Sequence, residues 1–494
     1  MKIWIVFCVL IVGCASTNTL TIMHTNDIHG HFAAERAAWR QDSAMVGGFA
    51  VLSGALDSVR KSDDRTIYLD AGDLMTGNPI CNMEVDGLKG AALLHMLKLC
   101  KCDAIEVGNH EFDLGPEHLR DFLATTDVSW VCSNVQEKSD HKAICAEYRI
   151  IERDGLKIGV IGLILTDLAG VVSQHAIEDF NVLDAAAAAQ PMIDEIDPAT
   201  DVIVLLTHNG VDNDIDLARH VSNCDVIVGG HSHTRLKEPL VENGVIIVQA
   251  GSFLKNLGVL KLRVKHDKVA DFDGKLVELD VARFAPDSEI SDYCKTYEDQ
   301  ISREYGEIIA TTSSNLTREY AATSPLGNLL CDLLRQHYET DIALVNSGGI
   351  RKDIPAGPIR KLDIVEMLPF TNSVMTFELS GREILLFANQ QARAQIGGKS
   401  ETLQMSGLEI SYAEKSGEPN DIEVLVNGLP VDADQNYRGV SIDYVLKSQA
   451  EQYLGFVPQQ TQDTGVQFSD FIMSSLASAN QPISPITEKR LIRK

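Results

Sequence analysis

Residues 107–113 place an amide, an imidazole and two carboxylates within a single short block, Val-Gly-Asn-His-Glu-Phe-Asp. The block follows an apolar stretch, residues 104–107, that predicts a buried strand, and it closes with Leu114-Gly115-Pro116, a turn that would start a new helix. In α/β sheets, reactive groups gather where strands end. The block therefore indicates a site of chemistry.

Four other apolar, β-branched runs end directly in Asp, Asn or His. These runs are residues 20–25, 66–69, 201–206 and 225–228. The polar groups that follow them include Asp27, His29 and His31, then Asp73, then His208, and finally His231 and His233. Any one such residue is more often a hydrogen-bonded turn or core residue. Five strand ends in series make a shared site the better interpretation.

The ligand types narrow the metal. Carboxylate, amide oxygen and imidazole without thiolate suit Zn, Mn, Co or Fe, whereas a set made only of oxygen would favour Ca or Mg. The candidates outnumber the ligands of one tetrahedral ion. We therefore expect two divalent ions, bridged by a carboxylate and roughly 3.5–4 Å apart, as in two-metal phosphoesterases.

At these residues the chain resembles the calcineurin-like metallophosphoesterases and, more narrowly, the 5′-nucleotidase family that includes UDP-sugar hydrolases. The resemblance rests on the spellings of residues 26–30, Asn-Asp-Ile-His-Gly, and 108–113, Gly-Asn-His-Glu-Phe-Asp. It implies one ion held by Asp27, His29, Asp73 and His233, and a second held by Asp73, Asn109, His208 and His231. It also implies a catalytic His110, oriented by Asp113, and a paired histidine of this kind can remain cationic where negative charge develops.

The alternation of strands and helices between Asp27 and His233 predicts an α/β sandwich, two sheets flanked by helices, over residues 20–286. Late strands are expected at 245–251 and 257–264, with a hairpin turn at Asp273-Gly274. Residues 287–309 show an amphipathic stripe and predict a linker helix. Residues 310–494 are expected to form a second, smaller α/β substrate-binding domain, which in the resembling family rotates about such a helix.

The second domain contains a helix signal at Ser324-Pro325 and a strand, residues 342–345, that ends in Asn346-Ser347-Gly348-Gly349-Ile350-Arg351. Glycines allow backbone amides to approach a ligand, and an arginine can bind phosphate through two donors. Alone, the segment is as readily a glycine-rich turn. The resemblance makes Asn346, Gly348, Gly349 and Arg351 candidates for substrate binding.

The resemblance also assigns Phe370 to one of two aromatic rings that sandwich the base, and stacking of this kind tolerates different bases. Tyr444 is matched to the second ring, although the Gly-Gly-Asp-Gly turn that the family has here is missing. Arg318 is matched to a phosphate-directed arginine that the family places closer to the helix at 325. These two departures concern the substrate and leave the metal ligands intact.

The N-terminus predicts export. Residues 1–13 have one positive charge, a short apolar run and a small residue before Cys14, as in a secretory signal peptide. The ending also resembles a lipobox, with a lipidated Cys14 as first mature residue and only membrane anchor, although an ordinary signal cleaved nearby is the alternative. The net charge of −27 argues against a nucleic-acid partner. Export permits disulfides among the cysteines.

We therefore expect a two-metal phosphohydrolase that releases phosphate from nucleoside 5′-monophosphates in the periplasm or at the cell surface. The nearest alternative keeps the metal chemistry and changes the substrate, to a UDP-sugar or a 2′,3′-cyclic nucleotide. An alternative of another class is a non-catalytic nucleotide-binding lipoprotein. The paired His110 and Asp113 argue against it, because a binding module does not need them.

Overall fold

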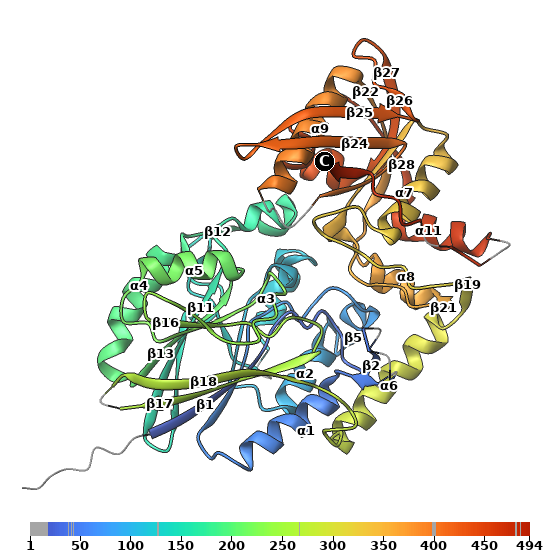
Figure 1. Ribbon diagram of the computed structural model, residues 1–494. Helices are drawn as coiled ribbons and strands as arrows, with labels where there is room; N and C mark the ends of the chain where they lie inside the picture. Colours follow the sequence, from blue (N-terminus) through green and yellow to red (C-terminus); the bar gives the residue numbers. More distant parts are fainter. Residues whose placement is uncertain are drawn as a thin grey trace, which may run out of the picture. The chain divides into compact units, whose positions relative to one another are not determined.

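The computed structural model describes residues 18–494, apart from positions 38, 41, 43, 126–127, 266, 398–401, 480–481 and 485. The expected signal peptide and Cys14 lie outside these residues. The chain forms two compact units (Figure 1). The first contains the chain up to residue 37 together with 42–74 and 91–291, and the second contains 38–41, 75–90 and 292–494.

The first unit is built on two mixed sheets of six strands each, which confirms the expected sandwich. In order across the first sheet, the strands are β18 Val269–Glu278, β17 Asn256–Val264, β1 Asn18–Thr25, β4 Thr66–Asp70, β7 Ala104–Glu106 and β8 Trp130–Val131. Across the second they are β10 Tyr148–Arg153, β11 Leu156–Ile164, β13 Val202–His208, β14 Val226–Gly229, β16 Val245–Val248 and β15 Leu240–Glu242.

The central strands of both sheets run parallel, so their carboxyl ends meet at one edge of each sheet. In the first sheet Thr25 of β1 lies opposite Asp70 of β4, and Asp70 lies opposite Ile105 of β7. In the second, Thr207 of β13 lies opposite Gly229 of β14. Loops that leave these ends can therefore present side chains to one place.

Apolar side chains from both sheets pack together to form the core of the sandwich. Ile22 and Leu69 of the first sheet share one buried cluster with Val160 and Val204 of the second. The other face of the second sheet is covered by α4 Ala185–Ile196 and α5 Val211–His220, where Ile193 packs with the strand residues. The remaining helices of this unit are α1 Phe49–Arg60, α2 Ala91–Leu99 and α3 Pro116–Leu123.

The expected hairpin turn at Asp273-Gly274 is wrong. Both residues lie inside β18, where Gly274 pairs with Leu260 of β17, and the N–H of Lys265 instead donates to the carbonyl oxygen of Lys268 between the two strands. A Cβ on Gly274 would lie 2.3 Å from Cγ of Pro239. The glycine is needed for this close contact and not for a turn.

The helix α6 Ser288–Tyr305 falls within the expected linker, and the boundary between the two units lies inside it, after Ser291. It begins where the Asp287 side chain accepts a hydrogen bond from the backbone N–H of Ile290. Ile290 and Ile301 of its apolar stripe are buried. None of the helices that the structure describes is both long and apolar enough to cross a bilayer.

The second unit is also α/β. One sheet has the order β23 Leu403–Ser406, β20 Ile342–Asn346, β27 Asn436–Ile442, β22 Ser373–Ser380 and β28 Gln460–Gln467. The other has the order β26 Leu429–Pro430, β25 Glu418–Val426, β24 Leu408–Lys415 and β29 Leu491–Arg493, and a further pair joins β19 Ile308–Thr312 to β21 Gly357–Arg360. Its helices are α7 Pro325–Tyr338, α8 Lys361–Met367, α9 Gly381–Ile396, α10 Ala450–Leu454 and α11 Phe468–Ala477. Ser324 caps α7, as expected, by accepting from the N–H of Gly327.

Candidate metal centre

All seven candidate ligands follow the carboxyl ends of five strands. The first sheet supplies residues after β1, β4 and β7, and the second supplies residues at the ends of β13 and β14. The candidates are Asp27, His29, Asp73, Asn109, His208, His231 and His233. The structure brings them together in two groups, and a third set of potential ligands, His29, Asp73 and His110, shares one residue with each group.

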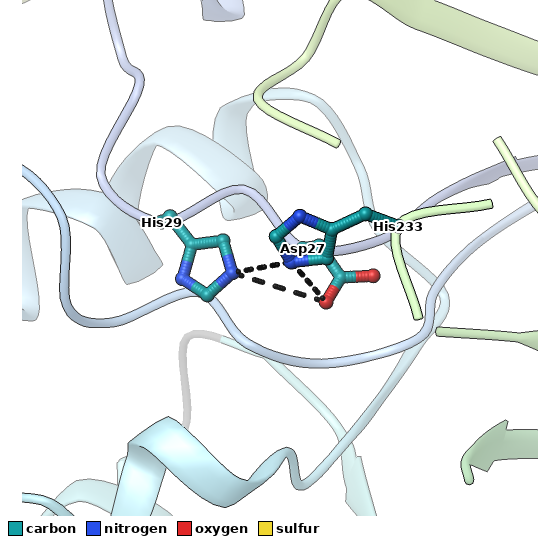
Figure 2. Close-up of side chains that lie close together, drawn as sticks. All are labelled: Asp27, His29 and His233. Carbon is teal, nitrogen blue, oxygen red and sulfur yellow. Dashed lines mark hydrogen bonds and ion pairs between the residues drawn. The ribbon is translucent and has the colours of Figure 1, made fainter. Parts of the chain in front are cut away.

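The first group contains Asp27, His29 and His233 (Figure 2). The Nε2 atoms of His29 and His233 lie 3.0 Å apart, and the His233 Nε2 lies 3.2 Å from Oδ1 of Asp27. The His29 Nε2 is 3.8 Å from the same oxygen. Two ring nitrogens and one carboxylate oxygen therefore point toward a common position.

The second group contains Asp73, His208 and His231. The Nε2 atom of His208 lies 3.1 Å from Oδ2 of Asp73, and the amide oxygen of Asn109 lies 2.9 Å from Nδ1 of His231. Asp73 also faces the first group, because its Oδ2 is 3.7 Å from Nε2 of His29. This carboxylate therefore has the position of a bridge between the two groups.

The atoms of the second group fit a cation. Nδ1 of His208 donates to the carbonyl oxygen of Ala71, which leaves the Nε2 lone pair to face Asp73. This Nε2 is buried, and the Asp73 carboxylate is its close neighbour. Two electron-rich atoms aimed at one place are stabilised by a metal ion between them. The residues present thus suit the divalent ions expected from the sequence.

A proton on Nε2 of His208 would meet the same demand for positive charge beside Asp73 that a metal ion meets. Burial disfavours the charged forms of Asp73 and His208, but their mutual attraction outweighs burial, lowering the pKa of Asp73 well below its usual value and raising that of His208 to about 10. Burial, followed by repulsion from His208, lowers the pKa of His231 to about 4. The site therefore stabilises positive charge beside Asp73 and keeps His231 as a neutral imidazole, the form that binds metals.

The backbone is strained at five of the seven candidates. Their φ angles are 52° for Asp27, 52° for His29, 57° for Asp73, 73° for His231 and 54° for His233. Residues other than glycine rarely adopt this left-handed backbone conformation, and each instance costs on the order of 1–3 kcal/mol. Such residues persist where the surroundings hold them in place, and they cluster at functional sites.

Two supporting residues were not singled out from the sequence. Glu111 is buried, and its carboxylate accepts from the backbone N–H groups of Gly108, Asp73 and Leu74, which fixes the loop carrying Asp73. Asn26 donates to Oδ2 of Asp27 and to the carbonyl oxygen of Gly251. Both lie within the motifs, but the sequence does not reveal which backbone groups they reach.

His110 is paired with Asp113, as expected. Its Nδ1 lies 2.7 Å from Oδ2 of Asp113, and its Nε2 lies 4.0 Å from Oδ2 of Asp73. The ring also packs against His29, with the ring centres 5.2 Å apart. His110 thus presents one nitrogen to the centre while a carboxylate holds the other.

In the second unit, several candidate substrate residues gather at the end of β20. Asn346, Gly349 and Phe370 line one concavity, and Gly348 lies in the buried turn Ser347–Gly349 beside it. The Arg351 guanidinium lies 6.0 Å from the centre of the Phe370 ring. The side-chain oxygen of Asn346 is buried and has no hydrogen-bond partner within the described residues.

The other two candidates lie at the margins of this region. Arg318 donates to the carbonyl oxygen of Ile350 and to the hydroxyl of Tyr320. Tyr444 begins a short π-helix, Tyr444–Ser448, and its ring lies 6.3 Å from that of Tyr453. Ile442, two residues earlier, lines the concavity, but Tyr444 itself does not.

Comparison with known families gives two matches in sequence order. Residues 20–235 match the family described as calcineurin-like phosphoesterase, and residues 306–455 match the 5′-nucleotidase C-terminal domain. The two matches correspond to the two groups of candidate residues.

Individual relatives cover most of the chain. An apyrase of Tabanus yao is 28% identical, covering 80% of this chain and 77% of the relative. A 5′-nucleotidase of Vibrio cholerae is 25% identical, covering 85% and 83%. The crystal structure of a 5′-nucleotidase precursor from Thermus thermophilus is similar, with a TM-score of 0.86 and 28% identity. The match covers 96% of this chain and 99% of that chain.

Proposed function

Because the chain belongs to the calcineurin-like phosphoesterases that carry a 5′-nucleotidase C-terminal domain, we propose that it releases phosphate from nucleoside 5′-monophosphates outside the cytoplasm. It is a metal-dependent phosphoester hydrolase. The observation that carries the proposal is the buried pair of ligand groups joined by Asp73. A site of that kind suits phosphoryl transfer.

We assign the ligands to two ions. Asp27, His29 and His233 would hold one ion, and Asn109, His208 and His231 the other, with Asp73 shared by both. Zn, Mn and Co suit this mixture of nitrogen and oxygen ligands. When bound, such ions activate water as a nucleophile and neutralise charge on the phosphoryl oxygens.

The chain's own contribution to the reaction is assigned to His110 and Asp113. Asp113 holds Nδ1 of the imidazole, which directs Nε2 toward the centre. From there a protonated Nε2 can donate to a phosphoryl oxygen or to the leaving oxygen as negative charge develops. The pairing supports a catalytic role for His110, since it fixes both the position of the ring and the site of its proton.

In the second unit, we assign base stacking to Phe370 and phosphate binding to Arg351 and Arg318. The gathering of Asn346, Gly349 and Phe370 at the end of β20 supports this assignment. Tyr444 remains the candidate for the second stacking ring. The glycines of Ser347–Gly349 allow close approach of a ligand to the backbone.

A second candidate activity is hydrolysis of a UDP-sugar or a 2′,3′-cyclic nucleotide at the same metal centre. The observation that favours it is the segment that begins at Tyr444, which forms a π-helix where the family has a glycine-rich turn. A changed wall beside the base would change the preferred substrate without altering the ligands. The non-catalytic alternative does not fit a phosphoester hydrolase.

We also propose that the protein is exported, through the signal at residues 1–13, and that a lipid on Cys14 is its membrane anchor. Mass spectrometry of the membrane-extracted protein tests this. An N-terminus carrying a diacylglyceryl mass on Cys14 would support the anchor, and an unmodified N-terminus after cleavage elsewhere would contradict it.

The function is tested by phosphate release from AMP, UMP, UDP-glucose and 2′,3′-cyclic AMP. The protein is stripped of metal and reloaded in turn with Zn, Mn, Co or Mg, with Asp73→Asn as the inactive control. Fast release from AMP and UMP is expected. Preference for UDP-glucose or the cyclic nucleotide would support the second candidate, and no release from any substrate with any metal would contradict both.

A further inference from the structure

Phe253 lies among three histidines of the first unit. Its ring centre is 5.6 Å from that of His29 and 5.4 Å from that of His233, and in both pairs the rings meet edge to face, at 61° and 80°. On a third side it stacks on His31, at 4.3 Å and 29°. Two of these histidines are proposed ligands of the same ion, so one aromatic ring touches two imidazoles of one ligand group.

The backbone at Phe253 is held in an unusual conformation. Its φ angle is 63°, in the left-handed region, and that of the following Leu254 is 49°. For a bulky residue this conformation is a clear outlier, which costs on the order of 1–3 kcal/mol. A glycine would avoid the strain, so the aromatic ring needs a reason other than the turn.

The contacts around the loop show what holds it. The N–H of Phe253 donates to the carbonyl oxygen of Asp27 over 2.8 Å. Asn26 donates to the carbonyl oxygen of Gly251 and accepts from the N–H of Ala250. The loop after β16 is thus tied directly to the turn that carries Asp27.

His31 is itself fixed. Its Nδ1 lies 2.6 Å from a carboxylate oxygen of Glu35, and the side chain is almost fully buried. A ring held in this way gives Phe253 a rigid face to stack on, and stacking and edge contacts of aromatic rings each contribute about 0.5–1.5 kcal/mol beyond burial. The order of contacts runs from Glu35 through His31 and Phe253 to the two ligands.

We propose that Phe253, backed by the His31–Glu35 pair, is a positioning residue that sets the ring planes of His29 and His233. This inference rests on the proposed ligand assignment. A metal ligand binds only when its nitrogen lone pair points at the ion, and residues that orient ligands typically change metal affinity 10–100-fold when they are lost. Phe253 orients through ring packing, where most such residues use a hydrogen bond.

The test measures metal binding to the full-length protein after its metal has been removed. Equilibrium dialysis with elemental analysis gives the affinity for each ion, and the visible spectrum of the Co²⁺ form reports the geometry of the ligands. Phe253→Leu is the main variant, and Phe253→Trp keeps an aromatic ring. Phe49 is a buried residue at the start of α1, and Phe49→Leu is the matched control for a general loss of packing. Wild type is expected to bind two ions.

In Phe253→Leu one ion is expected to bind about 10–100-fold more weakly, with an altered Co²⁺ spectrum, while the other keeps its affinity. Phe253→Trp should bind both ions with nearly the wild-type affinity. Phe49→Leu should lower the stability of the protein without making the affinity for one ion differ from that for the other. Equal weakening of both ions, or no weakening, in a folded Phe253→Leu protein would overturn the positioning role. A wild-type protein that binds fewer than two ions would instead overturn the ligand assignment, and this inference with it.

A second comparison separates packing from direct chemistry at His31. His31→Phe keeps a ring to stack on Phe253, whereas His31→Ala removes it. If packing is the cause, His31→Phe binds both ions as the wild type does, and His31→Ala weakens the same ion as Phe253→Leu. Loss of activity in both variants with unchanged metal binding would assign His31 to the substrate and overturn its role as support for Phe253.

Discussion

The candidate metal centre of the first unit and the candidate substrate residues of the second are held in different ways. In the first, five of the seven proposed ligands are buried, five have strained backbones, and the carboxylate of Glu111 accepts from three backbone N–H groups at once. In the second, Arg351 is partly exposed and lies beside Phe370 in a contact between a cation and a ring. The candidate metal ligands are thus held by a connected network of contacts, and the candidate substrate residues by fewer, separate contacts.

This difference predicts how substitutions in each unit affect activity. A change of one residue in the first unit alters a shared network, so it should affect every substrate alike. A change in the second unit should affect substrates unequally, because each contact recognises one part of the ligand.

The largest effect is expected from Asp73→Asn. The change removes the carboxylate shared by both ligand groups, while an amide oxygen can still accept from the N–H of His110, as Oδ1 of Asp73 does now. Turnover should fall by more than the roughly 10–100-fold that follows loss of a residue supporting a ligand, and equally for all substrates. Phosphate release and circular dichroism together check this. Turnover close to wild type in a folded variant would refute the shared carboxylate.

His110→Gln should lower kcat by about 10²–10⁴-fold, the range for a lost proton donor. Both metal ions should stay bound, because His110 is assigned no ligand role. Kinetics and metal analysis of the same preparation provide the check. Loss of one ion from the variant would show that His110 is a ligand. The metal analysis is needed because Nε2 of His110 lies close enough to Asp73 to join a ligand group.

Phe370→Leu tests the second unit. Loss of a stacking ring should raise KM for nucleotides by about 10–100-fold, which corresponds to roughly 1–3 kcal/mol. Hydrolysis of a substrate without a base, such as p-nitrophenyl phosphate, should be unchanged. Phe471→Leu, on α11, provides a control for packing in the same unit. Equal loss on both substrates would break the division between chemistry and recognition.

The smallest effect concerns stability and pH. Burial, with repulsion from Asp267 and Asp197, raises the pKa of Asp225 to about 6. The folded state thus favours the protonated form of Asp225. The contribution of this group to the free energy of unfolding is therefore complete below the ordinary pKa near 4 and is lost as the pH rises through about 6. Asp225→Asn should reduce this loss.

Urea unfolding of wild type and Asp225→Asn at about pH 4.5, 6 and 7.5 measures the effect. Relative to wild type, the variant should gain stability as the pH rises, with metal binding unchanged. The exposed Asp216→Asn is the control. A difference between the two proteins that does not vary with pH would show that Asp225 does not titrate in this range.

Sequence alone predicted what depends on local order. The five strand ends, the two α/β units and the cap at Ser324 follow from patterns of neighbouring residues, and the structure contains all of them. Asp273-Gly274 has the composition of a turn, yet the need for space beside Pro239, far away in sequence, decides its conformation.

The supporting contacts of the metal centre were not accessible in this way. The bonds of Asn26 to residues 250 and 251, and the contacts of Phe253 with His29 and His31, join positions more than two hundred residues apart. Nothing local distinguishes Phe253 from an ordinary core phenylalanine. The left-handed backbone of the ligands is likewise a product of the completed loops, because even Asp and His, which adopt it more often than other residues with side chains, do so only uncommonly.

The spread of the ligands along the chain, from Asp27 to His233, determines when metal can help the protein to fold. Neither of the two proposed ligand groups is complete until the last strand ends of the first unit have been synthesised and paired, because one needs His233 and the other needs His208 and His231. Contacts of this range make folding slow. Metal then stabilises only the finished fold, by mass action, and availability of metal in the final compartment therefore controls the lifetime of the protein more than its rate of folding.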